Sequence, residues 1–158
     1  MSDLYKKFVG IGRTGILNWI PDKIYINIAY FLRFKKRMNW KNPETFDEKL
    51  QWLKINNRNN AYSKMVDKYE AKNYVGNIIG KEYIIPTIGI YDKFDDIDFE
   101  KLPDKFVIKC THDSGSVVVV KDKSKLDIRK TRKKINKGLR NNGFNYGREW
   151  PYKNVKPR

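Results

Sequence analysis

The sequence contains few of the residues that build disulfide and metal sites. Its 158 residues include one cysteine, Cys110, and one histidine, His112. A single thiol excludes an internal disulfide framework, and no Cys–His spacing typical of zinc is present. The longest apolar run, residues 24–32, is interrupted by Asn27 and is far shorter than the roughly 20 residues that a transmembrane helix needs. No signal-peptide pattern opens the chain, so we expect a cytoplasmic protein.

Acidic residues are also scarce. The chain has 18 Asp and Glu against 34 Lys and Arg, a formal net charge of +16. This excess favours polyanionic partners such as nucleic acid, nucleotide phosphates or an anionic membrane, although compositional bias of the genome also explains it. Hydrophobic residues make up 40% and aromatic residues 14%, which excludes a disordered basic tail. The length fits one globular domain or slightly more.

The first 41 residues are basic and aromatic. Pro21 can open a helix, and the apolar residues after it recur at helical spacing: Ile24, Ile28, Phe31 and Leu32. The helix could rest on an anionic membrane, or it could turn this apolar face to the core and leave its basic end in water. We favour the core-facing interpretation.

Two further helices are predicted by their first residues. Thr45 and Glu48 form a capping box, in which each side chain accepts a hydrogen bond from a free backbone N–H, so a short helix should begin at residue 46. Asp67 and Glu70 repeat this spacing, and Gly80 marks the end of that second helix.

The second half of the chain shows β patterns followed by a basic helix. Residues 83–91 are rich in β-forming residues but interrupted by Pro86 and Gly89, and residues 92–103 predict an acidic loop or short helix. Two apolar runs, 106–109 and 117–120, flank a turn and predict a hairpin. Asp127 can cap a last helix, which should span about 128–140. This helix lacks aromatic residues between its cations, so we interpret it as a solvated charged face.

The predicted hairpin is the best candidate for chemistry. Lys109 ends the first strand, and a turn of small residues follows, in which backbone N–H groups could approach a phosphate and Gly115 could adopt unusual φ values. His112 could donate to that phosphate or simply bond to backbone. Cys110 should point to the core, opposite Lys109, and Asp113 more often stabilises a turn than holds a metal.

Four blocks in order resemble the TupA-like ATP-grasp family, bacterial proteins of capsular and teichuronopeptide-type polysaccharide loci that are often labelled glycosyltransferases. The resemblance covers residue 38 to the end. The blocks are Asn42-Pro43-x-Thr45-Phe46-x-Glu48-Lys49-Leu50-Gln51-Trp52-Leu53-Lys54, Asp67-Lys68-Tyr69, Phe106-Val107-Ile108-Lys109-Cys110-Thr111-His112-Asp113-Ser114-Gly115 and Gly147-Arg148-Glu149-Trp150-Pro151-Tyr152-Lys153-Asn154.

The resemblance implies an α+β fold, the N-terminal portion of an ATP-grasp fold. We expect a helical N-terminal segment over 1–41, an N-terminal lobe over 42–104, and the start of a nucleotide-binding lobe over 105–158. The sheet should be small and mixed, with a β-hairpin and flanking helices. Because the family continues into an adenine-contacting strand and magnesium ligands, we expect this chain to be an N-terminal fragment that is inactive alone.

The resemblance also implies ATP as cofactor, with magnesium held by residues outside this chain. Lys68 and Lys109 would contact the phosphates, and the loop that folds over them would include His112, Ser114, Gly115 and Ser116. The expected partners are a nucleotide and a polysaccharide precursor or its carboxylate, with peripheral association at the inner membrane face and no specific nucleic acid. The alternatives are a glycosyltransferase of a capsular polysaccharide locus, or a non-catalytic basic module that binds anionic polymer or membrane.

Overall fold

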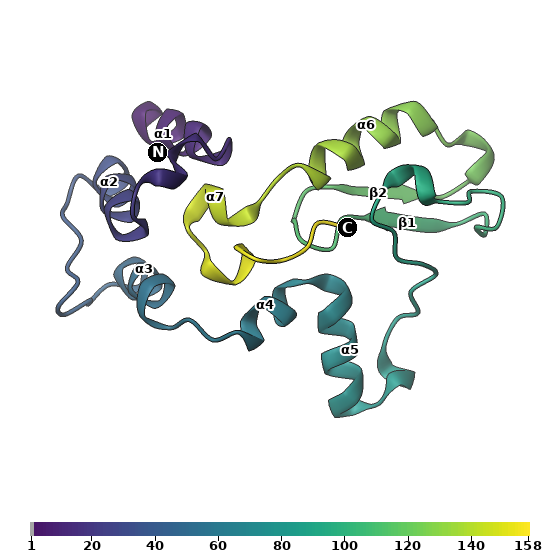
Figure 1. Ribbon diagram of the computed structural model, residues 1–158, viewed down its shortest axis with the longest axis horizontal. Helices are drawn as coiled ribbons and strands as arrows, with labels where there is room; N and C mark the ends of the chain where they lie inside the picture. Colours follow the sequence, from purple (N-terminus) through teal and green to yellow (C-terminus); the bar gives the residue numbers. More distant parts are fainter. Residues whose placement is uncertain (1) are drawn as a thin grey trace. The chain divides into compact units, whose positions relative to one another are not determined.

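A computed structural model describes residues 2–158, which form two compact units. The first contains the chain up to Ser63 together with Asn142–Asn154. The second contains Lys64–Asn141 and Val155–Arg158. Figure 1 shows the elements of each unit along the chain. The lobe boundaries expected at residues 41 and 104 refer to a complete ATP-grasp fold and stay a prediction.

The first unit is helical. Its elements are α1 (Asp3–Arg13), the 3₁₀ turn η1 (Ile16–Trp19), α2 (Asp22–Phe34), α3 (Phe46–Asn56), α7 (Gly143–Gly147) and η5 (Trp150–Tyr152). A short helix, α4 (Ala61–Val66), spans the boundary with the second unit. The capping box at Thr45 is confirmed: Glu48 N donates to Thr45 Oγ1 (3.2 Å), and Glu48 Oε2 accepts from Thr45 N (3.1 Å).

A buried arginine holds the first unit together. Arg148 is fully buried and adopts a left-handed conformation with φ of 54°. Its guanidinium donates to Asn18 Oδ1 and to the carbonyl of Leu17, each at 2.6 Å. It also lies 4.3 Å from the ring centroid of Tyr25 and 5.0 Å from that of Phe144. The Gly147-Arg148 motif near the end of the chain therefore joins α7 to η1 and α2.

The inward face of α2 differs from the predicted one. Tyr25, Ile26 and Tyr30 are buried, whereas Ile24, Ile28 and Phe31 are 51%, 37% and 49% exposed. The core-facing interpretation of the Ile24 stripe is therefore wrong. The helix is apolar around most of its circumference, and the inward side is the one on which Phe8 of α1 stacks against Tyr25, with ring centroids 4.8 Å apart.

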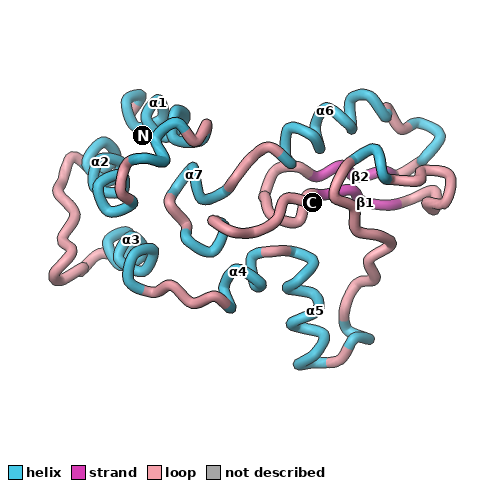
Figure 2. The backbone as a smooth tube through the Cα atoms, viewed as in Figure 1, coloured by secondary structure: helices cyan, strands magenta, loops and turns pink. Residues whose placement is uncertain are grey.

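The second unit contains the strands. It consists of α5 (Lys68–Ile79), η2 (Lys81–Tyr83), η3 (Phe94–Asp96), β1 (Phe106–Lys109), β2 (Val117–Val120), η4 (Lys123–Lys125) and α6 (Ile128–Leu139) (Figure 2). The predicted helix starts at Asp67 and Asp127 are confirmed, because each aspartate caps its helix. The predicted hairpin is also confirmed: β1 and β2 pair antiparallel with Lys109 opposite Val117.

The hairpin and α6 enclose two small cores. One gathers around Phe94, Cys110 and Ile135, and the other around Leu102, Phe106 and Val120. The α+β class is confirmed, and the sheet of the described residues is this antiparallel pair rather than a mixed sheet.

Residues 83–91 are not β structure, contrary to the sequence prediction. Residues 85–91 run as an extended segment without strand pairing. Pro86 has no N–H to give to a ladder, and Gly89 lacks a side chain to pack. The segment instead forms one wall of the cavity described below.

Candidate functional site

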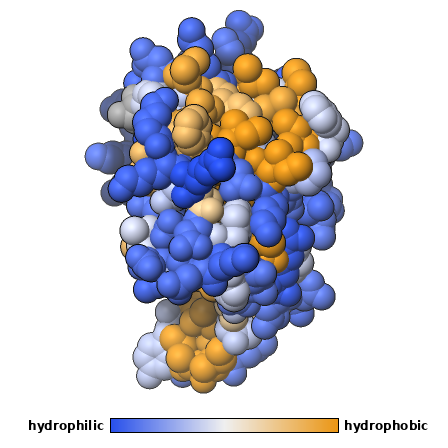
Figure 3. Space-filling view, turned by 90° about the vertical axis from the view of Figure 1, so that its left-hand side faces the viewer, coloured by the Kyte–Doolittle hydropathy of each residue, from blue (hydrophilic) through white to orange (hydrophobic). Residues whose placement is uncertain are grey.

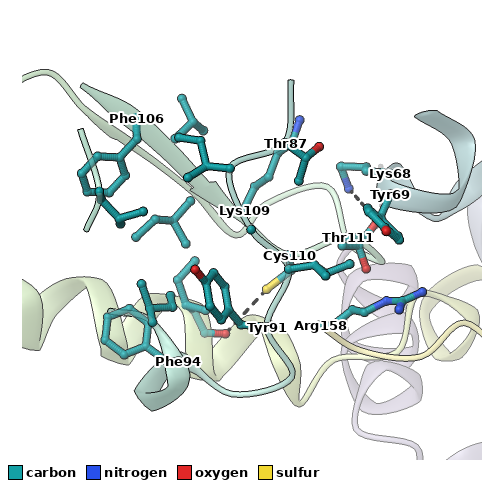
Figure 4. A pocket seen from close by; sticks show the side chains of 18 of the residues that line it. Lys68, Tyr69, Thr87, Tyr91, Phe94, Phe106, Lys109, Cys110, Thr111 and Arg158 are labelled. Carbon is teal, nitrogen blue, oxygen red and sulfur yellow. Dashed lines mark hydrogen bonds between the residues drawn. The ribbon is translucent and has the colours of Figure 1, made fainter. Parts of the chain in front are cut away.

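A cavity of about 470 Å³ lies within the second unit, a size typical of small-molecule sites. Its walls come from α5, the extended segment 85–91, β1 and α6. Figure 4 shows the two ends of this cavity. Phe94 and Phe106 lie at one end, Lys68, Thr111 and Arg158 lie at the other, and Lys109 and Cys110 lie between them. The cavity is therefore apolar at one end and cationic at the other.

Five cationic side chains line the cavity: Lys68, Lys72, Lys93, Lys109 and Arg158. Burial lowers the pKa of Lys68, and the neighbouring positive charge of Lys109 lowers it further, against the opposing effect of Asp113. Partial burial and the charge of Lys109 also lower the pKa of Lys72. The lysines thus repel one another, and a bound polyanion would relieve that repulsion.

Lys68 joins α5 to the turn between the strands. The side-chain ammonium of Lys68 donates to the carbonyls of Thr111 (3.2 Å) and Asp113. The backbone N–H of Lys68 also donates to the carbonyl of Thr111 (2.9 Å). The preceding Asp67 is buried; one carboxylate oxygen accepts from the first N–H groups of α5, and the other accepts from Thr111 Oγ1 (3.2 Å). The Asp67-Lys68 pair therefore fixes the helix start against the turn.

The last residue completes this cationic end. Arg158 O accepts from Thr111 N (2.7 Å), and its guanidinium pairs with Glu70 (2.8 Å) and lies 3.7 Å from Asp67. The same guanidinium lies 5.3 Å from the ring centroid of Tyr69. Arg158 thus closes the end of the cavity beside Lys68.

The turn 111–116 divides its residues between two environments. Ser114 and Gly115 are exposed, whereas His112 and Ser116 are buried. His112 Nε2 lies 3.1 Å from the carbonyls of both Gly138 and Asn141, and Ser116 Oγ donates to Asp113 (2.5 Å). The structure therefore brings Lys68 and Lys109 to one cavity but turns the side chains of His112 and Ser116 into the protein.

Gly115 is not used for an unusual backbone conformation. Its φ lies outside the left-handed region, since the glycines with positive φ are Gly15 and Gly80. A Cβ added at Gly115 would meet no atom within 4 Å. The sequence argument from φ is therefore wrong for this conformation; what Gly115 offers is an unobstructed backbone.

Cys110 and Asp113 have the structural roles predicted for them. Cys110 is buried beside Ile135, and burial raises the pKa of its thiol to about 11. A thiol that stays protonated is a poor nucleophile. Asp113 accepts from both the N–H and the hydroxyl of Ser116, which stabilises the turn.

The arrangement of an Asp-Lys helix start, a strand-terminal lysine and a small-residue turn around one cavity agrees with the comparison with known proteins. Residues 48–158 match the family described as TupA-like ATPgrasp. The chain belongs to this ATP-grasp family. No curated protein and no solved structure matches it.

Two features are absent from the described residues of this TupA-like ATP-grasp chain. Among residues 2–158, no group of three or more His, Cys, Asp or Glu side chains is placed to hold a metal ion. Within the same residues, none of the helices combines the length and hydropathy needed to span a bilayer.

Three of the cationic residues that line the cavity were not predicted from the sequence: Lys72, Lys93 and Arg158. Lys72 follows Lys68 by four residues, and a helical spacing of four places both on the same face of α5, so the signal was present. Arg158 carries no such signal, because its backbone bond to Thr111 and its ion pair with Glu70 join residues that lie far apart in the sequence.

Proposed function

We propose that this chain is the N-terminal part of an ATP-dependent carboxylate ligase that acts in bacterial cell-surface polysaccharide biosynthesis. Membership of the ATP-grasp family supports the use of ATP. The observation that carries the proposal is the cavity with cationic side chains at one end and apolar side chains at the other. A nucleotide suits this layout, because it joins a flat base to a polyanionic tail.

The proposed reaction forms an acyl phosphate from a carboxylate and the γ-phosphoryl group of ATP, and an amine or thiol then displaces the phosphate. The transferred group accumulates negative charge rather than requiring covalent help, so fixed cations lower the barrier. Lys68 and Lys109 are the proposed phosphate contacts, and the exposed backbone at Ser114 and Gly115 supplies N–H donors. His112 and Ser116 would support the turn from inside.

The proposed substrates follow from the same chemistry. The carboxylate would belong to a polysaccharide precursor, and the use of ATP implies a cytoplasmic place of action. Magnesium, when bound, would neutralise the charge of the phosphates.

A glycosyltransferase that uses a sugar nucleotide is the rival function. The chain does contain one Asp-x-Asp triplet, Asp96-Ile97-Asp98, of the kind that such enzymes use to hold a metal-bound diphosphate. Asp98, however, pairs with Lys101 (2.9 Å) and accepts from the N–H of Glu100 (3.2 Å). These bonds stabilise a turn, so the geometry favours the ligase.

Calorimetric titration of the chain with a non-hydrolysable ATP analogue tests the proposal. Lys109→Ala should weaken binding by about 1.5–3 kcal/mol, the usual range for a hydrogen bond to a charged group. Lys121→Ala is the matched control, because Lys121 is an exposed lysine next to the opposite end of the hairpin and does not line the cavity. Equal affinities of Lys109→Ala and Lys121→Ala for the analogue would show that Lys109 does not contact the nucleotide. Tighter binding of a uridine diphosphate sugar than of the ATP analogue would favour the glycosyltransferase.

A further inference from the structure

The outer side of α2 carries an apolar stripe that no part of the first unit covers. Ile24, Ile28 and Phe31 recur at intervals of four and three residues, and each is at least 37% exposed. Just before α2, Ile16 and Trp19 are 68% and 79% exposed. We call these five residues the α2 surface. Figure 3 shows hydrophobic side chains gathered on a face of the molecule, bordered by hydrophilic ones.

Cationic side chains flank the α2 surface at both ends. Lys23 precedes Ile24, and Lys35, Lys36 and Arg37 follow the helix. The Lys35 ammonium lies 6.0 Å from the ring centroid of Phe31. All four cationic residues are exposed. Their aliphatic stems can extend along the apolar stripe while their charged ends stay at its border.

The charge of this part of the chain is strongly one-sided. Residues 2–41 contain nine Lys and Arg but only two Asp, and both aspartates lie within 4 Å of cationic partners. An apolar stripe bordered by cations, with an exposed tryptophan shortly before it in the sequence, matches a bilayer interface, where acyl chains lie beneath anionic headgroups.

We propose that the α2 surface binds the surface of a lipid bilayer that contains anionic lipids. The stripe would enter the boundary between headgroups and acyl chains, with α2 parallel to the membrane plane. Lys23 and the Lys35–Arg37 cluster would contact the lipid phosphates. This proposal does not depend on the ATP site, because the residues it uses lie in the other unit.

Vesicle sedimentation with the full chain tests this proposal. The vesicles are phosphatidylcholine with about 30 mol% phosphatidylglycerol, compared with phosphatidylcholine alone, since anionic headgroups attract basic residues that lie near the membrane surface. We expect binding to the anionic vesicles to be at least tenfold stronger. Ile28→Ser/Phe31→Ser should reduce that binding about tenfold or more, because two apolar side chains leave the interface.

A control variant, Tyr74→Ser/Ile78→Ser in α5, removes exposed apolar side chains outside the α2 surface. These residues also lie on one exposed helical face, with 43% and 65% exposure, but α5 places no cluster of exposed cations beside them. This control should bind like the wild type. Circular dichroism verifies that each variant keeps its helices.

A second pair of variants separates the α2 surface from general charge. Lys35→Glu/Lys36→Glu leaves the core untouched and should abolish most vesicle binding. Lys130→Glu/Lys133→Glu makes the same charge change on the exposed face of α6 and should reduce binding much less.

Several results would overturn the proposal. One is absence of vesicle binding by the folded chain, and another is equal loss of binding from the two charge reversals, which would indicate adhesion by net charge alone. A third is that the chain does not bind vesicles but forms a dimer in solution, and that Ile28→Ser/Phe31→Ser dissociates this dimer. That result would show that the α2 surface binds a second copy of the chain.

Discussion

Gly138 lies where α6 packs most closely on the turn between the strands. A Cβ at this position would lie 2.5 Å from the Ser116 Cβ and 2.9 Å from the Cys110 sulfur. The carbonyl of the same residue lies 3.1 Å from His112 Nε2. The absent side chain is thus what allows the helix to hold the turn that carries the proposed phosphate contacts.

We expect Gly138→Ala to destabilise the protein. Overpacking lowers the free energy of unfolding by about 1–3 kcal/mol. The higher helix propensity of alanine relative to glycine offsets up to roughly 1 kcal/mol of this loss. Gly10→Ala is the matched control: Gly10 is also helical, but a Cβ there meets nothing within 4 Å, so the variant should be slightly more stable than wild type. Urea denaturation compares the two, and similar free energies of unfolding would contradict the close approach.

Cys110 makes stability dependent on pH in the alkaline range. Burial raises the pKa of its thiol from 9.0 to about 11, so the folded state keeps the proton that the unfolded state has lost. Its contribution is complete below pH 9 and is lost progressively between pH 9 and 11. Wild type should therefore lose more stability than Cys110→Val across this interval, measured as the free energy of unfolding at each pH. Parallel curves for the two proteins would mean that the thiol is not buried.

At the scale of elements, hydrogen bonds at helix starts determine where the helices begin. The side chains of Thr45, Asp67 and Asp127 each accept from the first backbone N–H groups of a helix, of α3, α5 and α6 respectively. In α5 the cap also serves the site, because the other oxygen of Asp67 bonds to Thr111.

We expect Thr45→Ala to lower the free energy of unfolding by about 1 kcal/mol, the usual value of an N-cap. Thr45→Ser keeps the hydroxyl and should remain near wild type. Affinity for the ATP analogue should be unchanged in both variants, because α3 lies outside the cavity. Denaturant midpoints report stability. An unchanged midpoint for Thr45→Ala would show that the capping box contributes nothing.

At the scale of the whole molecule, the net charge of +16 attracts any polyanion without selecting one. Such attraction acts between exposed charges and is screened at physiological ionic strength. Contacts inside the cavity are shielded from the salt. Salt therefore distinguishes the proposed nucleotide site from general attraction.

We expect the chain to bind duplex DNA weakly at low salt and to release it at physiological salt, whereas ATP-analogue binding should persist. Parallel salt titrations with labelled DNA and with the analogue measure both. DNA binding that resists salt while analogue binding disappears would favour the non-catalytic basic module over the ligase.

Local sequence determined the elements whose signals lie within a few residues. The three helix starts, the stop at Gly80 and the hairpin over 106–120 were all predicted, because caps, glycine and short apolar runs act on neighbouring backbone. The Asp-Lys pair and Lys109 were recognisable for the same reason, as was the family.

Tertiary structure alone decided which faces are buried. The spacing of apolar residues in α2 allowed two inward stripes, and packing against Phe8 and Arg148 selected Tyr25 over Ile24. The burial of His112 and the arrival of Arg158 at the cavity likewise depend on partners 26 and 47 residues away, Gly138 and Thr111. Periodicity establishes that a helix has an apolar side, but the position of that side depends on what the rest of the chain brings against it.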